Sequence, residues 1–195
     1  MTRSFAVSFD YRCPFARNAH ESVVQGVRDG RDWAVRFVPF SLDQAHVDEG
    51  ATAVWDRAPG ERGTGVLALE WGLAVRDAFA DRFLDFHVAT FAARHDESLQ
   101  LRDEAVLREV ASSVGLDPDA VSAFVGTGAP LAALRAEHTA AARDDAMFGV
   151  PTFVDGKAAV FVRLMDRARP EQVDHVLDLL AFEGLNEFKH TRVPR

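Results

Sequence analysis

The stretch FDYRCPF at residues 9–15 decides the fold together with a second stretch, FGVPTFV, at residues 148–154. An apolar, β-rich run leads into the first stretch, and a helical pattern follows it to about Asp29. Pro14 suits the first position of a helix, because its missing N–H would be unpaired there in any case. The first stretch therefore predicts a strand, a turn that ends at Cys13, and a helix that begins at Pro14.

Four segments have the composition and alternation of β-strands. Residues 5–9 and 33–38 flank the first helix, and this arrangement predicts a right-handed parallel crossover. Residues 152–154 and 158–161 flank the dipeptide Asp155-Gly156. That dipeptide favours a tight hairpin, because both of its residues tolerate positive φ.

A helical pattern fills the middle of the chain, over residues 66–147. Four apolar residues in it are spaced as one face of a single helix: Val75, Phe79, Phe83 and Phe86. Asp117-Pro118-Asp119 has the pattern of a helix start. Residues 41–65 show no periodicity and predict an irregular loop. A last amphipathic helix is expected to begin at Pro170 and to be capped by Gly184.

The order β-α-β, helical block, β-β-α predicts the α/β class and resembles the thioredoxin fold with an all-helical insertion. The insertion separates the two sheet motifs in sequence but not in space. We expect a thioredoxin-like domain over residues 1–40 and 148–184, a connecting loop over 41–65, an inserted helical domain over 66–147 and a C-terminal tail over 185–195.

Composition excludes several classes of protein. The 195 residues carry 22 basic and 30 acidic side chains, a formal charge of −8 that disfavours binding to nucleic acid. A single cysteine permits no internal disulfide and no cysteine-based zinc site, and we expect no metal. No apolar run is long enough for a membrane span, and the N-terminal run is too short for a signal peptide. The sequence therefore predicts a soluble, cytoplasmic protein.

Cys13 is the main candidate for chemistry because of its place at a predicted helix N-terminus. The helix dipole and the unpaired N–H groups there stabilise a thiolate, and Arg12 would add to this effect if its side chain turns inward. These features predict a depressed pKa and a nucleophilic thiol. The alternative is an inert buried cysteine, a common fate of this residue type.

Other polar residues give weaker signals. Asp10 is either a proton acceptor beneath the thiol or a residue that caps the turn. His20, two helical turns after Cys13, is expected at the surface, and Asp144 and Asp145 at a solvated helix end. The glycines of residues 59–65 lack the lysine and the leading strand of a phosphate loop, and predict a flexible segment.

The two stretches 9–15 and 148–154 resemble the active-site segment and the cis-proline segment of the DsbA-like thioredoxin-fold family. The resemblance covers residues 4–183 and includes the spacing, the helical insertion, the hairpin and the final helix. That family also includes 2-hydroxychromene-2-carboxylate isomerases and kappa-class transferases, which typically carry serine in place of Cys13. Residues 187–192 resemble the mycothiol-using nitroreductase branch.

The resemblance implies a role for each residue of the site. Cys13 would be the catalytic nucleophile, and Pro151 would be cis and lie against it. Val150 would offer its backbone N–H and C=O groups to a bound peptide or thiol. Pro14 and Phe15 would complete the surface that binds the thiol or the substrate.

One position departs from the family pattern. Redox-active members have the motif Cys-x-x-Cys, whereas this chain has Ala16 at the second cysteine position. A second cysteine would release a mixed disulfide intramolecularly, and Ala16 cannot. The chemistry left to Cys13 is therefore that of a single thiol. Cys13 could form a mixed disulfide that an external small thiol resolves, it could be oxidised to a sulfenic acid, or it could add to an electrophile.

Three functions fit these features. The first is a thiol-dependent oxidoreductase that acts through Cys13 on an electrophilic or disulfide substrate, with glutathione or mycothiol as co-substrate and no tightly bound cofactor. The second is a glutathione- or mycothiol-dependent isomerase or transferase, in which the helix N-terminus activates the sulfur of the bound thiol. The third is a non-catalytic module that binds peptides or ligands beside Pro151. A homodimer is compatible with all three.

Overall fold

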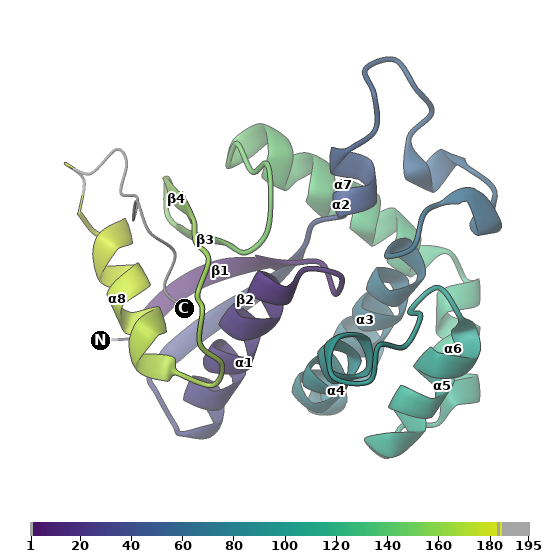
Figure 1. The fold of residues 1–195 in the computed structure, drawn as a ribbon, viewed down its shortest axis with the longest axis horizontal. Helices are drawn as coiled ribbons and strands as arrows, with labels where there is room; N and C mark the ends of the chain where they lie inside the picture. The colour runs from purple at the N-terminus through teal and green to yellow at the C-terminus, as the bar shows by residue number, and fades with distance from the viewer. Residues whose placement is uncertain (1, 183, 185–195) are drawn as a thin grey trace.

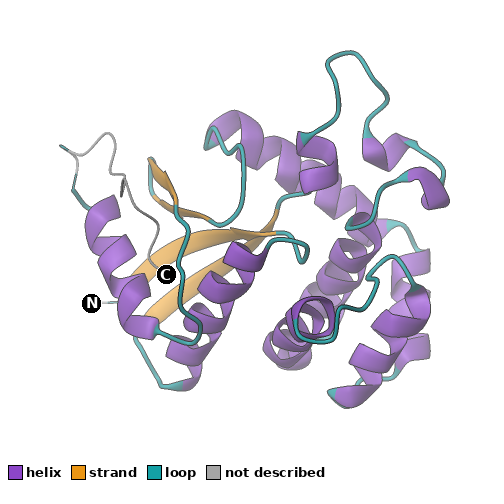
Figure 2. Ribbon diagram, in the orientation of Figure 1, coloured by secondary structure: helices purple, strands orange, loops and turns teal. Residues whose placement is uncertain are grey.

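The four-stranded sheet is built from two distant parts of the chain (Figures 1 and 2). The structure is a computed structural model that describes residues 2–182 and 184. β1 (Arg3–Phe9) pairs in parallel with β2 (Trp33–Pro39) and antiparallel with β3 (Thr152–Asp155), which pairs with β4 (Ala158–Phe161). The sheet order is β2-β1-β3-β4. The predicted α/β class and thioredoxin-like order are therefore confirmed.

The central strand β1 is covered on both of its faces. Phe5, Val7 and Phe9 alternate with Ala6 and Ser8, and all five are buried. An apolar run of this kind is typical of a strand with helices on both faces of its sheet.

Helix α1 (Pro14–Arg28) lies between the last helix and the helical block (Figure 1). It packs against α8 (Pro170–Leu180) on one side and against α4 (Phe83–His95) of the helical block on another. The predicted cap at Gly184 is wrong, because α8 already ends at Leu180 with Ala181 as its C-cap. Residues 185–195, the predicted tail, and residues 187–192 within it lie outside the described residues.

The middle of the chain is helical, as the sequence predicts. Its helices are α3 (Val66–Ala78), α4 (Phe83–His95), α5 (Glu104–Ser113), α6 (Pro118–Gly126) and α7 (Ala129–Asp144). The expectation of one continuous face through Phe79 and Phe83 is wrong. Phe79 has φ −136° and ψ 48°, which ends α3, and a 3-10 turn (Ala80–Arg82) starts the chain in a new direction. The Asp117 side chain caps α6, as predicted.

Residues 41–65 are more ordered than expected. They contain α2 (Leu42–Ala45) and two 3-10 turns (Val54–Asp56 and Pro59–Glu61). The Asp43 side chain accepts a hydrogen bond from the N–H of Gly65 at 2.9 Å. The Asp43 carboxylate therefore lies against the glycine segment and ties it to α2.

One cluster of buried apolar side chains runs from the sheet into the helical block. Val7 and Phe153 of the sheet, Trp71 of α3 and Leu107 of α5 all belong to it.

Among the described residues, no helix is long and apolar enough to cross a membrane.

Candidate active site

Cys13 caps the first turn of α1. Its backbone is extended, with φ −88° and ψ 117°, and Pro14 follows at the start of the helix. The sulfur accepts a hydrogen bond from the N–H of Ala16 at 3.4 Å, which is the bond that a serine or aspartate oxygen makes at other helix starts. Cys13 is half-buried and Pro14 is exposed. The sulfur is thus held at the helix N-terminus.

The cis-proline segment lies directly against the sulfur. The Val150–Pro151 peptide bond is cis, and Cys13 Sγ donates a hydrogen bond to the carbonyl oxygen of Val150 at 3.3 Å. Two contacts hold this segment on the sheet: the N–H of Thr152 donates to Ser8 Oγ at 2.9 Å, and that of Val162 donates to the Pro151 carbonyl at 3.0 Å. The structure therefore brings Cys13, Val150 and Pro151 together.

The pKa of Cys13 is raised, so the prediction of a depressed pKa is wrong. Burial of the sulfur is the largest cause, because desolvation disfavours the charged thiolate. The N–H groups of Ala16 and Phe15 and the charge of Arg163 lower the pKa, while the carboxylate of Asp10 raises it. The helix N-terminus acts as the sequence suggests, but desolvation outweighs it.

Asp10 caps the turn that leads to Cys13. Its carboxylate is fully buried and accepts hydrogen bonds from the N–H of Arg12 at 2.9 Å and the N–H of Leu42 at 2.8 Å. Its carbonyl accepts from the N–H of Cys13 at 3.0 Å. Burial raises the pKa of Asp10, against the effect of these bonds and of Arg12. Of the two expected roles, the structure supports turn capping.

Arg12 points away from the sulfur. Its guanidinium pairs with Asp43 at 2.8 Å and donates to Thr64 Oγ1 at 3.0 Å. Arg12 Nε is the one buried side-chain nitrogen or oxygen atom without a hydrogen-bond partner in the described part of the chain. Arg12 therefore ties the active-site turn to residues 43–65 and is not the cation of the thiol.

Arg163 is the cation whose charge acts on Cys13, and sequence reasoning missed it. It lies 150 residues away in sequence, just after β4, and its Cζ lies 5.1 Å from the centre of the Phe15 ring. No local pattern marks this arginine. Arg163 reaches the site because the segment that follows β4 runs alongside α1.

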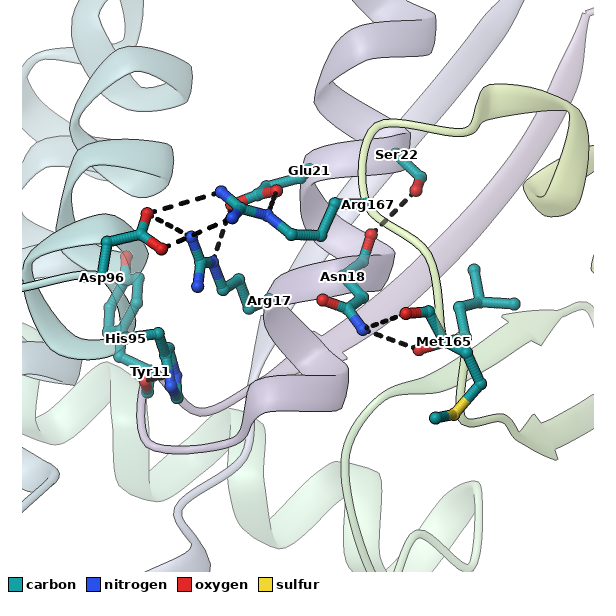
Figure 3. A network of polar contacts seen from close by, with 10 residues as sticks. Tyr11, Arg17, Asn18, Glu21, Ser22, His95, Asp96, Met165 and Arg167 are labelled. Atoms are coloured by element: carbon teal, nitrogen blue, oxygen red, sulfur yellow. Dashed lines mark hydrogen bonds and ion pairs between the residues drawn. The ribbon is translucent and has the colours of Figure 1, made fainter. Parts of the chain in front are cut away.

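Residues 162–169, here termed the strap, carry Arg163 and are attached to α1; Figure 3 shows the attachment at Met165 and Arg167. Asn18 of α1 donates hydrogen bonds to the carbonyls of Leu164 at 2.9 Å and Met165 at 3.2 Å. Ser22 Oγ accepts from the N–H of Arg169 at 3.0 Å. A network of two arginines and two carboxylates completes the attachment: Arg17, Glu21, Asp96 and Arg167.

His20 is fully buried, so its predicted place at the surface is wrong. Its Nε2 lies 3.0 Å from the carbonyl oxygen of Ser8, and its Nδ1 lies 2.9 Å from Nε2 of His87. His87 Nδ1 in turn lies 2.8 Å from the hydroxyl of Tyr11. The helical block covers this side of α1, and a helix periodicity alone does not show which neighbour covers a helix.

The direction of this chain of hydrogen bonds follows from its ends. A carbonyl only accepts, so His20 Nε2 carries the hydrogen and His20 Nδ1 accepts from His87. His87 Nδ1 then accepts from the Tyr11 hydroxyl. This direction holds for neutral histidines, and burial keeps both neutral, because it lowers the pKa of His20 to about 4 and that of His87 well below its usual value. These hydrogen bonds link α4, α1 and β1 to Tyr11, which lies two residues before Cys13.

The chemistry that this site permits is that of one thiol. Cys13 is the single cysteine of the sequence, and Ala16 is fully buried at the place of a second one. Among the described residues, no three histidine, cysteine, aspartate or glutamate side chains are grouped to hold a metal.

Asp144 and Asp145 end α7, and Asp144 pairs with Arg143 at 2.6 Å, as expected for a solvated helix end.

Several solved structures share this fold. A thioredoxin-like oxidoreductase from Silicibacter pomeroyi DSS-3 is 24% identical, with a TM-score of 0.59 over 91% of this chain and 86% of that chain. A 2-hydroxychromene-2-carboxylate isomerase is 14% identical, with a TM-score of 0.66 over 93% and 97%. The thiol-disulfide exchange protein alpha-DsbA2 from Wolbachia pipientis is 18% identical, with a TM-score of 0.62 over 91% and 81%. At these identities the likeness shows the fold.

Comparison with curated proteins gives no match. The sequence model of the DSBA-like thioredoxin domain, however, matches residues 74–178, more than half of the chain. The match includes most of the helical block, the cis-proline segment, the hairpin and most of α8. The chain therefore belongs to the family of DSBA-like thioredoxin domains, whose function is of the thiol-oxidoreductase or isomerase kind.

Proposed function

We propose that this protein is a thiol-dependent oxidoreductase that acts through Cys13 alone, with glutathione or mycothiol as its co-substrate. The observation that carries the proposal is the position of the single cysteine. It caps α1 and faces the cis Val150–Pro151 peptide, and buried Ala16 takes the place of a resolving thiol. A site with one thiol requires its second thiol from solution.

The reaction divides into two disulfide exchanges. In the first, the Cys13 thiolate attacks one sulfur of a substrate disulfide, the substrate S–S bond breaks, and the other half leaves as a thiolate that takes up a proton. In the second, the thiolate of the small thiol attacks the substrate sulfur of the mixed disulfide. A disulfide forms between the small thiol and the substrate half, and Cys13 leaves as a thiolate. No further oxidant is consumed.

The raised pKa of Cys13 gives substrate binding a role in activating the sulfur. In the free protein, the thiol hydrogen is donated to the Val150 carbonyl. A ligand whose N–H donates to that carbonyl displaces the thiol hydrogen, which then passes to water. The resulting thiolate keeps the bond from the Ala16 N–H and the charge of Arg163.

The same raised pKa favours one alternative. In a thiol-dependent isomerase or transferase, the sulfur of the bound glutathione or mycothiol is the nucleophile, and Cys13 stays protonated beside it. The similarity of this fold to a 2-hydroxychromene-2-carboxylate isomerase agrees with this second candidate. A non-catalytic ligand-binding module is the third.

Intact-protein mass separates the three functions. After incubation with glutathione disulfide or mycothiol disulfide, the proposed oxidoreductase gains one thiol adduct, which the reduced thiol then removes. Cys13→Ser gains none. Tight non-covalent binding of the reduced thiol without any adduct would instead support the isomerase or transferase. A protein that forms no adduct and binds no small thiol would contradict both enzymatic functions.

A further inference from the structure

Three phenylalanines and one arginine form a continuous surface beside Cys13, here termed the Arg163 face. The Arg163 Cζ lies 5.1 Å from the centre of the Phe15 ring and 5.6 Å from that of the Phe161 ring. The Phe161 ring centre lies 5.1 Å from that of Phe148, whose side chain is 73% exposed. The face therefore combines one cation with aromatic rings that remain open to solvent.

Arg163 has no acidic partner among the described residues. Most of the other described arginines pair with a carboxylate or donate to a backbone carbonyl, as Arg12, Arg17 and Arg167 do near the site. Aromatic rings accept no conventional hydrogen bond from the guanidinium, so the N–H donors of Arg163 stay available, and the planar guanidinium matches the geometry of a carboxylate.

Two residues of the Arg163 face belong to the segments that hold Cys13 and Val150. Phe15 lies in the first turn of α1, two residues after Cys13, and Phe148 lies two residues before Val150. Asn18 of α1 binds the carbonyl of Met165 in the strap (Figure 3), and Ser22 binds the N–H of Arg169, so the segment that carries Arg163 is attached to the helix that begins after Cys13. An anion held by Arg163 therefore lies beside Cys13.

We propose that the Arg163 face binds the acidic group of a small aromatic substrate, a class that includes aromatic carboxylates. The carboxylate pairs with Arg163, and the aromatic ring of the substrate packs on Phe161 and Phe148. The inference rests on the proposed function of Cys13, because it assigns the substrate class of the same site. One cation and two open rings are too small a surface for a stable protein interface, which buries about 800 Å² on each partner.

Two aromatic disulfide reagents, one negatively charged and one neutral, test the inference. Dithiobis(nitrobenzoate) is an aromatic disulfide with two carboxylates, and dithiodipyridine is a neutral aromatic disulfide. Each is attacked by the Cys13 thiolate, forms a mixed disulfide and releases one coloured thiol or thione. The ratio of the two rates reports the preference for the anion, because any change in thiolate content affects both rates alike.

We expect Arg163→Gln to lower this rate ratio by about two- to fivefold, the effect of one exposed ion pair. Arg163→Lys keeps the charge but not the planar donors, and should lower the ratio less. Arg36→Gln is the matched control, because Arg36 is also exposed and without an ion pair among the described residues, but lies on the edge strand β2. Benzoate should slow the wild-type reaction more than acetate does.

An unchanged ratio in Arg163→Gln would overturn the inference and leave the proposed function intact. If Cys13 reacts with neither reagent, the proposed function fails, and binding of benzoate to Cys13→Ser becomes the test of the face. Benzoate-induced changes in the NMR signals of Phe148 and Phe161 would then support it, and their absence would overturn it. Stronger protection of Cys13 by an acidic peptide than by benzoate would show that the assigned substrate class is wrong.

Discussion

At Cys13, two physical effects of the same helix start oppose each other. The N–H groups of the first turn stabilise a thiolate, and the packing that brings the cis-proline segment against the sulfur desolvates it. The sequence shows the first effect, because Pro14 marks a helix start. It does not show the second, because burial depends on residues that lie more than 130 positions away.

The rate of alkylation of Cys13 by iodoacetamide should therefore rise only at high pH. Because burial raises the pKa of this thiol, we expect the inflection above the value of about 8.5 for an unperturbed cysteine. Arg163→Gln should move the inflection higher still, since the charge of Arg163 lowers the pKa. An inflection below that value would show that the helix N-terminus outweighs desolvation.

Position 16 should determine whether the site works with one thiol or two. The N–H of Ala16 lies 3.4 Å from Cys13 Sγ, and the Ala16 side chain is fully buried in the same turn. We expect Ala16→Cys to form a reversible disulfide with Cys13 and to gain disulfide-oxidant activity. Counting free thiols after mild oxidation measures this directly.

Ala19→Cys is the matched control for that experiment. Ala19 is also fully buried in α1, but it lies six residues after Cys13 and cannot reach it. This variant should keep two free thiols or form adducts with external thiols. If Ala16→Cys behaves in the same way as Ala19→Cys, position 16 is not the resolving position.

At the scale of the elements, the sequence predicts what depends on local pattern. Alternation, proline and the Asp155-Gly156 dipeptide give β1, α1, β2 and the β3–β4 hairpin to within two residues. The errors arise where tertiary contacts decide. His20 lies in a helix of correctly predicted extent, but its burial depends on His87 of α4, and Arg163 reaches the site only through the strap.

Gly72 of α3 lies close to Tyr11 in the active-site turn, and a substitution at Gly72 shows whether this close approach stabilises the fold. A Cβ at Gly72 would lie 2.5 Å from the Tyr11 hydroxyl oxygen, whose hydrogen bond to His87 it would disturb. Alanine favours a helix over glycine by about 1 kcal/mol, yet we expect Gly72→Ala to lower the free energy of unfolding by about 1–3 kcal/mol. Urea denaturation measures this difference.

Gly126→Ala supplies the control at the end of α6. Nothing lies within 4 Å of a Cβ built at Gly126. The same substitution there should leave stability unchanged or raise it slightly. If both variants gain stability, the close approach of Tyr11 to α3 does not constrain the fold.

At the scale of the whole molecule, buried histidines join the helical block to the sheet. The chain from Tyr11 through His87 to His20 ends at β1, and His138 of α7 accepts a hydrogen bond from the N–H of Ser41 at 3.2 Å. In this arrangement each of the three histidines accepts a hydrogen bond on its Nδ1 atom, which only a neutral imidazole can do. Burial lowers the pKa of His20 and of His138 to about 4, and that of His87 well below its usual value.

The free energy of unfolding should consequently rise with pH between about 4 and 6.5. In that range the unfolded chain binds protons on these histidines and the folded protein does not, so acid favours unfolding. A pKa lowered from 6.5 to about 4 corresponds to about 3 kcal/mol for His20 alone. The stability due to His20 is complete above pH 6.5 and is lost as the pH falls towards 4.

Urea denaturation of variants at several pH values isolates this effect from that of other groups. Burial raises the pKa of Asp10 and Glu70, which makes stability fall with pH and so opposes the histidines. His20→Gln removes the titrating group, and its stability should rise less steeply than that of the wild type between pH 4 and 6.5. His175→Gln, an exposed position on α8, should keep the wild-type slope. Equal slopes for wild type and His20→Gln would mean that His20 is protonated inside the folded protein, and the direction assigned to the buried hydrogen-bond chain would be wrong.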